Sequence, residues 1–144
     1  MWSLEYDPKL SFLAPSYAYA PGTEQPPNAL DGDLWAGQFE WDQSFAAYML
    51  GIDHLGLALS QIIALVKMKT AAGFVPGFSS GAFKMRDCSQ PPITSKALFE
   101  ISKRWGVNRT HWALDLCFDD LYTWNTWMYT QRREAPLGLL SYGG

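Results

Sequence analysis

The chain has 144 residues, the size of one domain, and 48% of them are hydrophobic. The formal net charge is −3, and there is no basic run and no long apolar segment, which argues against a nucleic-acid partner and a membrane span. Aromatic residues are abundant at 15%, and such an excess serves either a heavy core or a site that stacks sugar rings.

The cysteines and histidines form no recognisable ligand pattern. Cys88 and Cys117 lie in different segments without CxxC spacing, and His54 and His111 do not complete a metal-binding set with them. We therefore expect two free thiols, no metal site and no cofactor. The N-terminus lacks the basic region and apolar segment of a signal peptide, which slightly favours a cytoplasmic location.

Residues 1–34 are predicted to be a loop-rich N-terminal segment. Prolines interrupt every helical or strand period there: Pro8, Pro15, Pro21, Pro26 and Pro27. A loop of this length is typical of a segment that wraps a larger body, or of a damaged gene end. Residues 35–144 are expected to form the helical part of the chain.

Residues 42–71 are predicted to form one long helix, which Asp42 caps and Gly73 ends. Its apolar residues recur at spacings of three and four, the pattern of one buried stripe. They are Phe45, Met49, Ile52, Leu55, Leu59, Ile62 and Val66.

Two more helices are predicted after a loop at residues 73–92. The first covers residues 93–105, with Ile93, Ala97, Leu98 and Ile101 facing inward. The second covers residues 110–132, with an inward stripe of Leu114, Phe118, Leu121, Tyr122, Trp124 and Met128. An extended loop follows at residues 136–143.

These elements predict an all-α fold of about three helices separated by long and short loops. Alternating long and short connections are typical of an α-toroid, in which helical hairpins form concentric rings. Periodicity alone also permits a three-helix bundle, although bundles usually have short connections.

The first candidate site is the segment Phe39-Glu40-Trp41-Asp42, at a junction between loop and helix. An apolar ring beside a carboxyl group favours its protonated form, which suits a general acid. An aspartate before an amphipathic helix is also a common N-cap, so Asp42 has a structural interpretation as well.

The second and third candidate segments are 86–92 and 119–127. Two prolines hold Gln90 rigidly, and its amide can bond to sugar hydroxyls, although a polar loop that ends in proline before a helix is common. Trp124 and Trp127 share a helical face, where either can stack on a sugar or fill the core, and we expect at least one in the core. Asn125 lies off that stripe and could point into a cleft.

The order of these motifs resembles glycoside hydrolase family 63, most closely its bacterial α-glucosidase and mannosylglycerate hydrolase-like members. The resemblance covers residues 35–143. It rests on a Trp-Asp at a helix start, a Gly-x-Val-Pro loop, a Ser-Gln-Pro-Pro turn, a Leu-x-x-Trp-Asn-x-Trp helix and a final Gly-Leu-x-x-Tyr-Gly. Trehalases of the same clan share the Trp-Asp and Ser-Gln-Pro-Pro elements.

The resemblance implies part of an (α/α)6 toroid that hydrolyses short α-linked glycosides with inversion, either glucosides or mannosyl- and glucosylglycerate-like compounds. By this resemblance Asp42 is the general acid. The implied substrate-binding residues are Phe39, Trp41, Arg86, Gln90, Trp124 and Asn125.

The chain departs from the family pattern in three ways. Cys88 stands where relatives have an arginine before Ser-Gln-Pro-Pro, and Arg86 could replace it in part. The catalytic base of relatives lies beyond the position of Gly144, so we expect this chain alone to be inactive. Three helices do not close a ring of twelve, so the missing helices are expected from a longer chain or from self-association.

Three alternatives remain open at this point. The chain could be a helical module that binds carbohydrate without cleaving it, through its aromatic residues. It could belong to a trehalase-like enzyme, or be a structural module whose tryptophans only fill the core.

Overall fold

The computed structural model describes residues 3–7, 12–17, 35–80, 85, 88–134 and 136–141. This described part of the chain is mainly helical, as predicted, with four helices. They are α1 (Glu40–Leu50), α2 (Leu55–Lys67), α3 (Thr94–Trp105) and α4 (Val107–Gln131).

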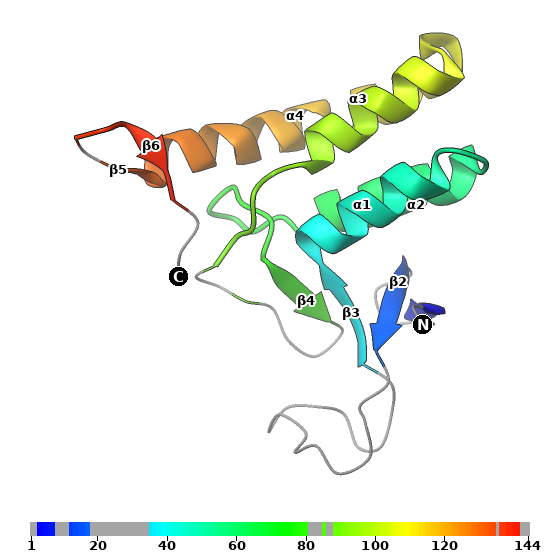
Figure 1. Cartoon of the computed structure of the whole chain (residues 1–144), viewed down its shortest axis with the longest axis horizontal. Helices are drawn as coiled ribbons and strands as arrows, with labels where there is room; N and C mark the ends of the chain where they lie inside the picture. The colour runs from blue at the N-terminus through cyan, green and yellow to red at the C-terminus, as the bar shows by residue number, and fades with distance from the viewer. Residues whose placement is uncertain are drawn as a thin grey trace.

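The helices form two hairpins that lie side by side. Figure 1 shows α1 beside α2 and α3 beside α4, and contacts between α1 and α3 and between α2 and α4 join the hairpins. Gly106 alone connects α3 to α4, with φ at +85°, a value that favours glycine. This single-residue connection starts α4 three residues earlier than we predicted.

One long helix over residues 42–71 was a wrong prediction. The chain turns at residues 51–54, where the amide of His54 donates to the carbonyl of Leu50 at 2.8 Å and α1 ends. The Nδ1 of His54 then accepts a 3.2 Å hydrogen bond from the amide of Leu57 and caps α2. Two helices whose apolar residues happened to continue in phase produced one apparent stripe.

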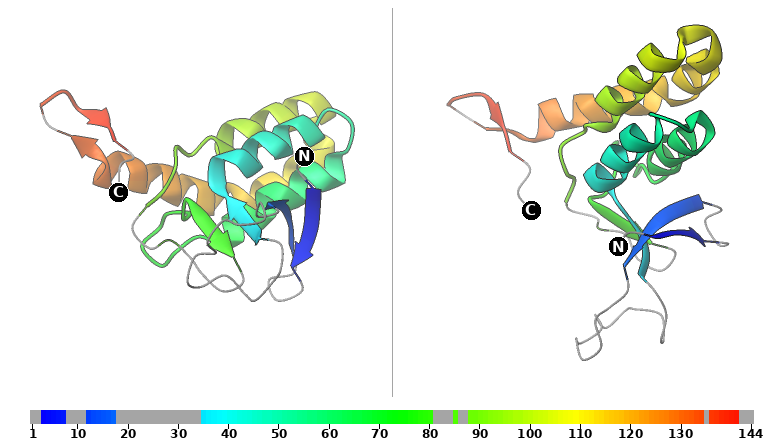
Figure 2. Two further views of the ribbon diagram at one scale, coloured as in Figure 1. Left: turned by 60° about the horizontal axis from the view of Figure 1, so that its bottom comes forward. Right: turned by 45° about the vertical axis from the view of Figure 1, so that its right-hand side comes forward.

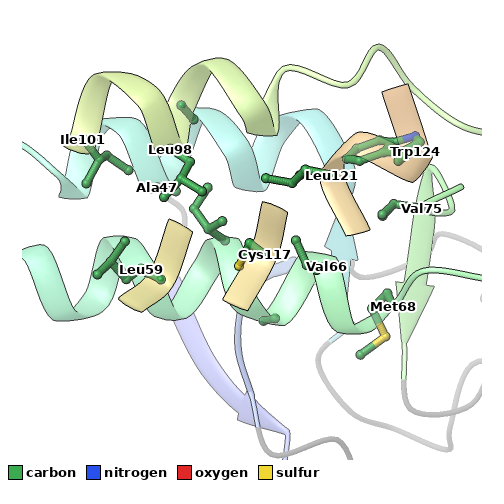
Figure 3. Packing of buried hydrophobic residues seen from close by; sticks show 14 of the residues in the cluster. Ala47, Leu59, Val66, Met68, Val75, Leu98, Ile101, Cys117, Leu121 and Trp124 are labelled. Atoms are coloured by element: carbon green, nitrogen blue, oxygen red, sulfur yellow. The ribbon is translucent and has the colours of Figure 1, made fainter. Parts of the chain in front are cut away.

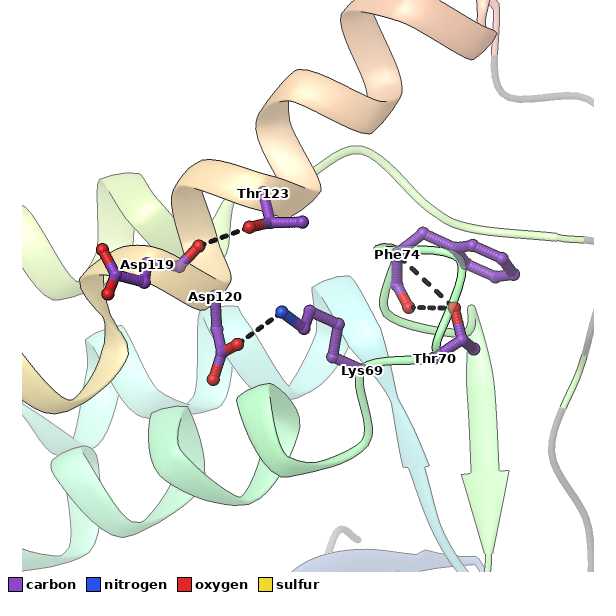
Figure 4. A network of polar contacts seen from close by, with 6 residues as sticks. All are labelled: Lys69, Thr70, Phe74, Asp119, Asp120 and Thr123. Carbon is purple, nitrogen blue, oxygen red and sulfur yellow. Dashed lines mark hydrogen bonds and ion pairs between the residues drawn. The ribbon is translucent and has the colours of Figure 1, made fainter.

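The predicted C-terminal end of that helix was also wrong. Helix α2 ends at Lys67, and a separate turn follows, in which the Thr70 hydroxyl donates to the carbonyl of Phe74 at 3.0 Å. Gly73 lies within this turn at φ +100° and does not cap the helix. In Figure 4 this turn lies beside an ion pair between Lys69 and Asp120 of α4. Lys69 Nζ lies 2.5 Å from Asp120 Oδ1.

A small antiparallel sheet packs against the first hairpin, on the side of α2 (Figures 1 and 2). Among the described residues its order is β1 (Ser3–Asp7), β2 (Phe12–Tyr17), β3 (Trp35–Phe39) and β4 (Phe78–Ser80). The prediction that residues 1–34 are all loop is therefore wrong for β1 and β2. Pro15 is tolerated because it pairs only with Leu4 of β1, while β3 begins to pair at Ser16.

The predicted loops after α2 and after α4 also contain short strands. Strand β4 lies inside the segment 73–92, where it pairs with β3. Beyond α4, β5 (Arg133–Glu134) and β6 (Leu139–Leu140) form a two-stranded hairpin with an exposed surface. Both pairings join short segments that carry no alternating pattern of their own.

The core lies between the two helical hairpins (Figure 3). Nine residues predicted to face inward are buried: Leu59, Ile62, Val66, Ala97, Leu98, Ile101, Leu121, Trp124 and Met128. Five others predicted to face inward are at least half exposed: Phe45, Met49, Ile52, Phe118 and Tyr122. The buried side of α4 begins with the small residues Thr110, Ala113 and Cys117. Their small side chains let the helices approach closely.

Helix α1 has an inverted distribution of polarity. Its buried residues are Glu40, Gln43, Ser44 and Ala47. The large apolar side chains of α1 and the turn after it are exposed: Trp41, Phe45, Tyr48, Met49 and Ile52. A helix that buries its polar face and exposes its apolar face is suited to contacts on both sides.

Candidate functional site

Asp42 lies in the first turn of α1, as its third residue. Phe39 occupies the N-cap position, with extended backbone and no side-chain cap, so the prediction that Asp42 caps the helix is wrong. The Asp42 carboxyl group is half-buried, and a negative charge in the first turn is favoured by the helix dipole.

The Ser-Gln-Pro-Pro turn connects this helix start to the rest of the fold. Oε1 of Gln90 accepts a 3.1 Å hydrogen bond from the backbone amide of Trp41, one of the amides that a helix start leaves unpaired. The hydroxyl of Ser89 donates to the carbonyl of Val75 at 2.8 Å. The indole Nε1 of Trp124 donates to the Ser89 hydroxyl at 3.1 Å. The turn therefore joins three motifs that lie far apart in the sequence.

The aromatic residues near Asp42 differ in exposure. Trp41 is 38% exposed, and its ring centroid lies 6.3 Å from that of Phe45, which is also exposed. Phe39 is half-buried and packs at 4.7 Å against Phe78 of β4. Trp41 and Phe45 thus offer exposed aromatic surface near Asp42, whereas Phe39 packs on the sheet.

The two α4 residues expected near the site are held in different ways. Trp124 is fully buried, which confirms that at least one tryptophan of this face belongs to the core. Asn125 is exposed, and its Nδ2 donates to Ser95 Oγ at 2.9 Å and to the carbonyl of Leu121 at 2.8 Å. Neither side chain touches Asp42 directly, and Trp124 acts on the site through Ser89. Arg86 lies outside the described residues.

Sequence analysis missed Glu40, the carboxyl group closest in sequence to Asp42. Glu40 is fully buried, and burial, the largest cause, raises its pKa from 4.5 to about 9. A hydrogen bond from Thr94 Oγ1 at 3.2 Å opposes the shift and the charge of Asp42 adds to it. The signal available in the sequence was a glutamate one residue before Trp-Asp, which does not reveal its burial.

The interior of the described part contains other buried polar side chains besides Glu40. Nε2 of Gln43 donates to the carbonyl of Gln61 at 3.3 Å. Within the part of the chain that the structure describes, several buried side-chain atoms have no hydrogen-bond partner: Gln38 Nε2 and Oε1, Glu40 Oε2, Gln43 Oε1, Gln61 Nε2 and Oε1, Ser79 Oγ and Ser102 Oγ. An interior this polar is uncommon in a helical core and constrains how α1 packs on α2.

A cavity of about 330 Å³ opens at the other end of α1. Its lining is Tyr48, Gly51, Ile52, Glu100, Ile101, Lys103 and Arg104. The candidate site around Asp42 is therefore separate from this cavity, since the cavity begins six residues further along the helix.

Cys88 and Cys117 are both free thiols, as predicted, and burial raises the pKa of Cys117 to about 11. Within the described ranges, no three His, Cys, Asp or Glu side chains gather where they could hold a metal ion. The same ranges contain no helix with the length and apolar character needed to cross a membrane.

No family model, curated protein or solved structure matches this chain.

Proposed function

We propose that this chain is the general-acid region of an inverting glycoside hydrolase with an (α/α)6 toroid, acting on short α-linked glycosides. The observation that carries the proposal is the hydrogen bond between the Gln90 side chain and the Trp41 amide. It joins the Trp-Asp and Ser-Gln-Pro-Pro motifs, 49 residues apart, at the turn of α1 that bears Asp42.

In this proposal Asp42 protonates the glycosidic oxygen as the bond breaks. A carboxylate on the opposite face of the sugar, roughly 6.5–9.5 Å away, activates the attacking water. The exposed rings of Trp41 and Phe45 offer an apolar surface on which a sugar can stack. Glucosides and mannosyl- or glucosylglycerate-like compounds are the proposed substrates.

The two hairpins suit a larger ring of helical hairpins. They lie side by side, and apolar residues remain exposed on both free flanks, on α1 at Phe45 and Met49 and on α4 at Trp112 and Leu116. Further hairpins, from a longer chain or from self-association, would cover these flanks and supply the catalytic base.

The test uses a form of the protein that also contains the proposed further hairpins and their catalytic base. Asp42→Asn is expected to lower kcat for an α-glycoside by roughly 10²–10⁴-fold, because the leaving oxygen loses its proton donor. Asp115→Asn on the exposed face of α4 is the matched control and should keep full activity. Proton NMR of the first product formed should show the inverted anomer. Full activity in Asp42→Asn would overturn the proposal.

A second candidate function is carbohydrate binding without cleavage. The paired, exposed rings of Trp41 and Phe45 favour it, because they need no catalytic partner to bind a sugar. Sugar-dependent quenching of tryptophan emission, with no reducing sugar released, would support this function. Including trehalose among the sugars also tests the trehalase-like alternative.

A further inference from the structure

The buried contact between α1 and α3 contains more hydrogen bonds than its two hydroxyl groups have protons. Ser44 Oγ lies 2.7 Å from Thr94 Oγ1, and Thr94 Oγ1 lies 3.2 Å from Glu40 Oε1. Ser44 Oγ also donates to the backbone carbonyl of Glu40 at 3.0 Å. Three hydrogen bonds require three protons, but two hydroxyl groups carry only two.

A neutral carboxyl group on Glu40 supplies the third proton. When Glu40 is ionised, the Thr94 hydroxyl donates to its carboxylate. When Glu40 is neutral, the Ser44 hydroxyl donates to the Glu40 carbonyl, the Thr94 hydroxyl donates to Ser44 instead, and the carboxyl O–H donates to Thr94. All three side chains are fully buried, so water does not provide the missing proton. The ring closes only with Glu40 protonated, and an ionised carboxylate leaves one of the three contacts without a proton.

We propose that Glu40 is a positioning residue: as a neutral acid it closes this hydrogen-bonded ring, ties the first turn of α1 to α3 and fixes the place of Asp42. The role assigned to Asp42 rests on the proposed function, whereas the tie between the helices does not. Gln90 restrains the same turn from the other side through the Trp41 amide. The two restraints act on consecutive residues, Glu40 and Trp41, immediately before Asp42.

The surroundings of Glu40 are consistent with a neutral acid. Its backbone amide donates to the carbonyl of Gly77 at 3.1 Å, which fixes the main chain but offers no charge to the side chain. Helix α3 faces Glu40 with the hydroxyl of Thr94, which does not titrate. Whenever Asp42 is ionised, its negative charge also favours the protonated form of Glu40.

Three variants test the proposal. Glu40→Gln keeps a neutral group that can donate to Thr94, Glu40→Ala removes it, and Thr94→Val removes the hydroxyl while it keeps the side-chain shape. Thr130→Val is the matched control, because Thr130 is exposed and its hydroxyl donates only to backbone carbonyls of its own helix. If Glu40→Ala fails to fold, the Thr94→Val and Glu40→Gln variants still decide the question.

The first measurement is hydrogen exchange of the Trp41 amide in this chain, together with the infrared spectrum at pH 7. Thr94→Val should speed the exchange at least about tenfold and Glu40→Gln less than about threefold, relative to Thr130→Val. The carbonyl band of a protonated carboxylic acid should be present in the wild type and absent in Glu40→Gln. Unchanged exchange in Thr94→Val, or no such band, would overturn the proposal even if Asp42 is the general acid.

The second measurement is hydrolysis in the form that carries the base. Thr94→Val should lower kcat by about 10–100-fold with KM nearly unchanged, since a displacement near 1 Å costs about that much. The single variant Glu40→Gln should keep kcat near the wild-type value. Should Asp42→Asn retain hydrolysis, the proposed function fails, and the exchange and infrared results still decide the tie between α1 and α3.

Discussion

The indole nitrogen of Trp124 donates a 3.1 Å hydrogen bond to the hydroxyl of Ser89, across the interface between α4 and the Ser-Gln-Pro-Pro turn. Ser89 passes the restraint on, because it donates to the carbonyl of Val75 at 2.8 Å. The bond is buried at both ends, and the indole N–H of Trp124 depends on the Ser89 hydroxyl as its acceptor.

Breaking this bond should destabilise the fold. Trp124→Phe and Ser89→Ala are each expected to lower the free energy of unfolding by about 1–3 kcal/mol. Ser89→Ala leaves the indole N–H and the Val75 carbonyl without this partner, and Trp124→Phe removes the bond and part of a fully buried ring. The double variant should cost less than the two single variants added together, by at least about 0.5 kcal/mol. Urea denaturation measures all three, and additive costs would contradict the coupling. Trp112→Phe, at a half-exposed position on α4, should cost less than about 0.5 kcal/mol.

Glu40→Gln should change how stability depends on pH. In the unfolded chain the pKa of Glu40 is near 4.5, and in the fold burial raises it to about 9. Between these values the unfolded state releases a proton that the folded state keeps. The contribution of Glu40 to stability is therefore fully present below pH 4.5 and is lost as the pH rises to about 9. By pH 7 the loss is about 3 kcal/mol.

The measurement is urea denaturation of both proteins at pH 5, 7 and 9. Glu40→Gln should lack this fall, so its advantage over the wild type should grow with pH. Stability curves that stay parallel over this range would contradict a buried carboxyl group with a raised pKa.

Gly51→Ala should destabilise the junction of the two hairpins. A Cβ on Gly51 would lie 2.7 Å from Ile101 Cγ1 and 3.2 Å from two backbone oxygens of α1. We expect a cost of about 1–3 kcal/mol from overpacking, measured by thermal or urea unfolding.

Gly56→Ala is the control for this prediction. Gly56 lies in the first turn of α2, where a Cβ meets only the ring of His54, at 3.6 Å or more. Alanine should be neutral there or stabilise by up to about 1 kcal/mol, because it is the better helix former. A loss of stability at Gly56 as large as that at Gly51 would mean that the contact with Ile101 is not the cause.

The exposed apolar face of α1 should make this chain associate. Phe45 is 54% exposed and Met49 69% exposed, on a face without charged residues between Asp42 and Asp53. The double variant Phe45→Lys/Met49→Lys should shift the sedimentation velocity profile toward monomer and change the unfolding free energy by less than about 1 kcal/mol. Leu139→Lys, on the exposed β6, should leave association unchanged. A wild type that is monomeric at all concentrations would contradict the prediction.

Sequence patterns predicted the second hairpin better than the first. Helix α3 and the C-terminal part of α4 follow a regular apolar stripe, and their cores at Ile101 and Trp124 were found correctly. In α1 the stripe of Phe45 and Met49 pointed to the wrong face, because hydrophobicity does not distinguish burial in this fold from exposure to a partner. The break at residues 51–54 had its own signal in Gly51, which the continuing periodicity concealed.

Part of the candidate site could be predicted and part could not. Trp41, Asp42 and Gln90 were recognised as polar or aromatic residues at loop-to-helix junctions, and the structure joins two of them by one hydrogen bond. Glu40 was missed because its importance comes from Thr94, 54 residues away. Strands β1 and β2 were missed for a different reason. They pair locally, from Asp7 with Phe12 to Ser3 with Ser16, but the prolines of this segment were interpreted as breakers of any strand.

The turn at Ser89 and Gln90 connects segments that are far apart in the chain, and we expect these segments to open together. Adjacent residues of this turn hold the start of α1, the loop at Val75 and the later half of α4. If the turn opens, all three lose a buried restraint at once. Their slowest-exchanging amides are therefore expected to share one opening free energy, and the rest of α2 and α3 to retain their own.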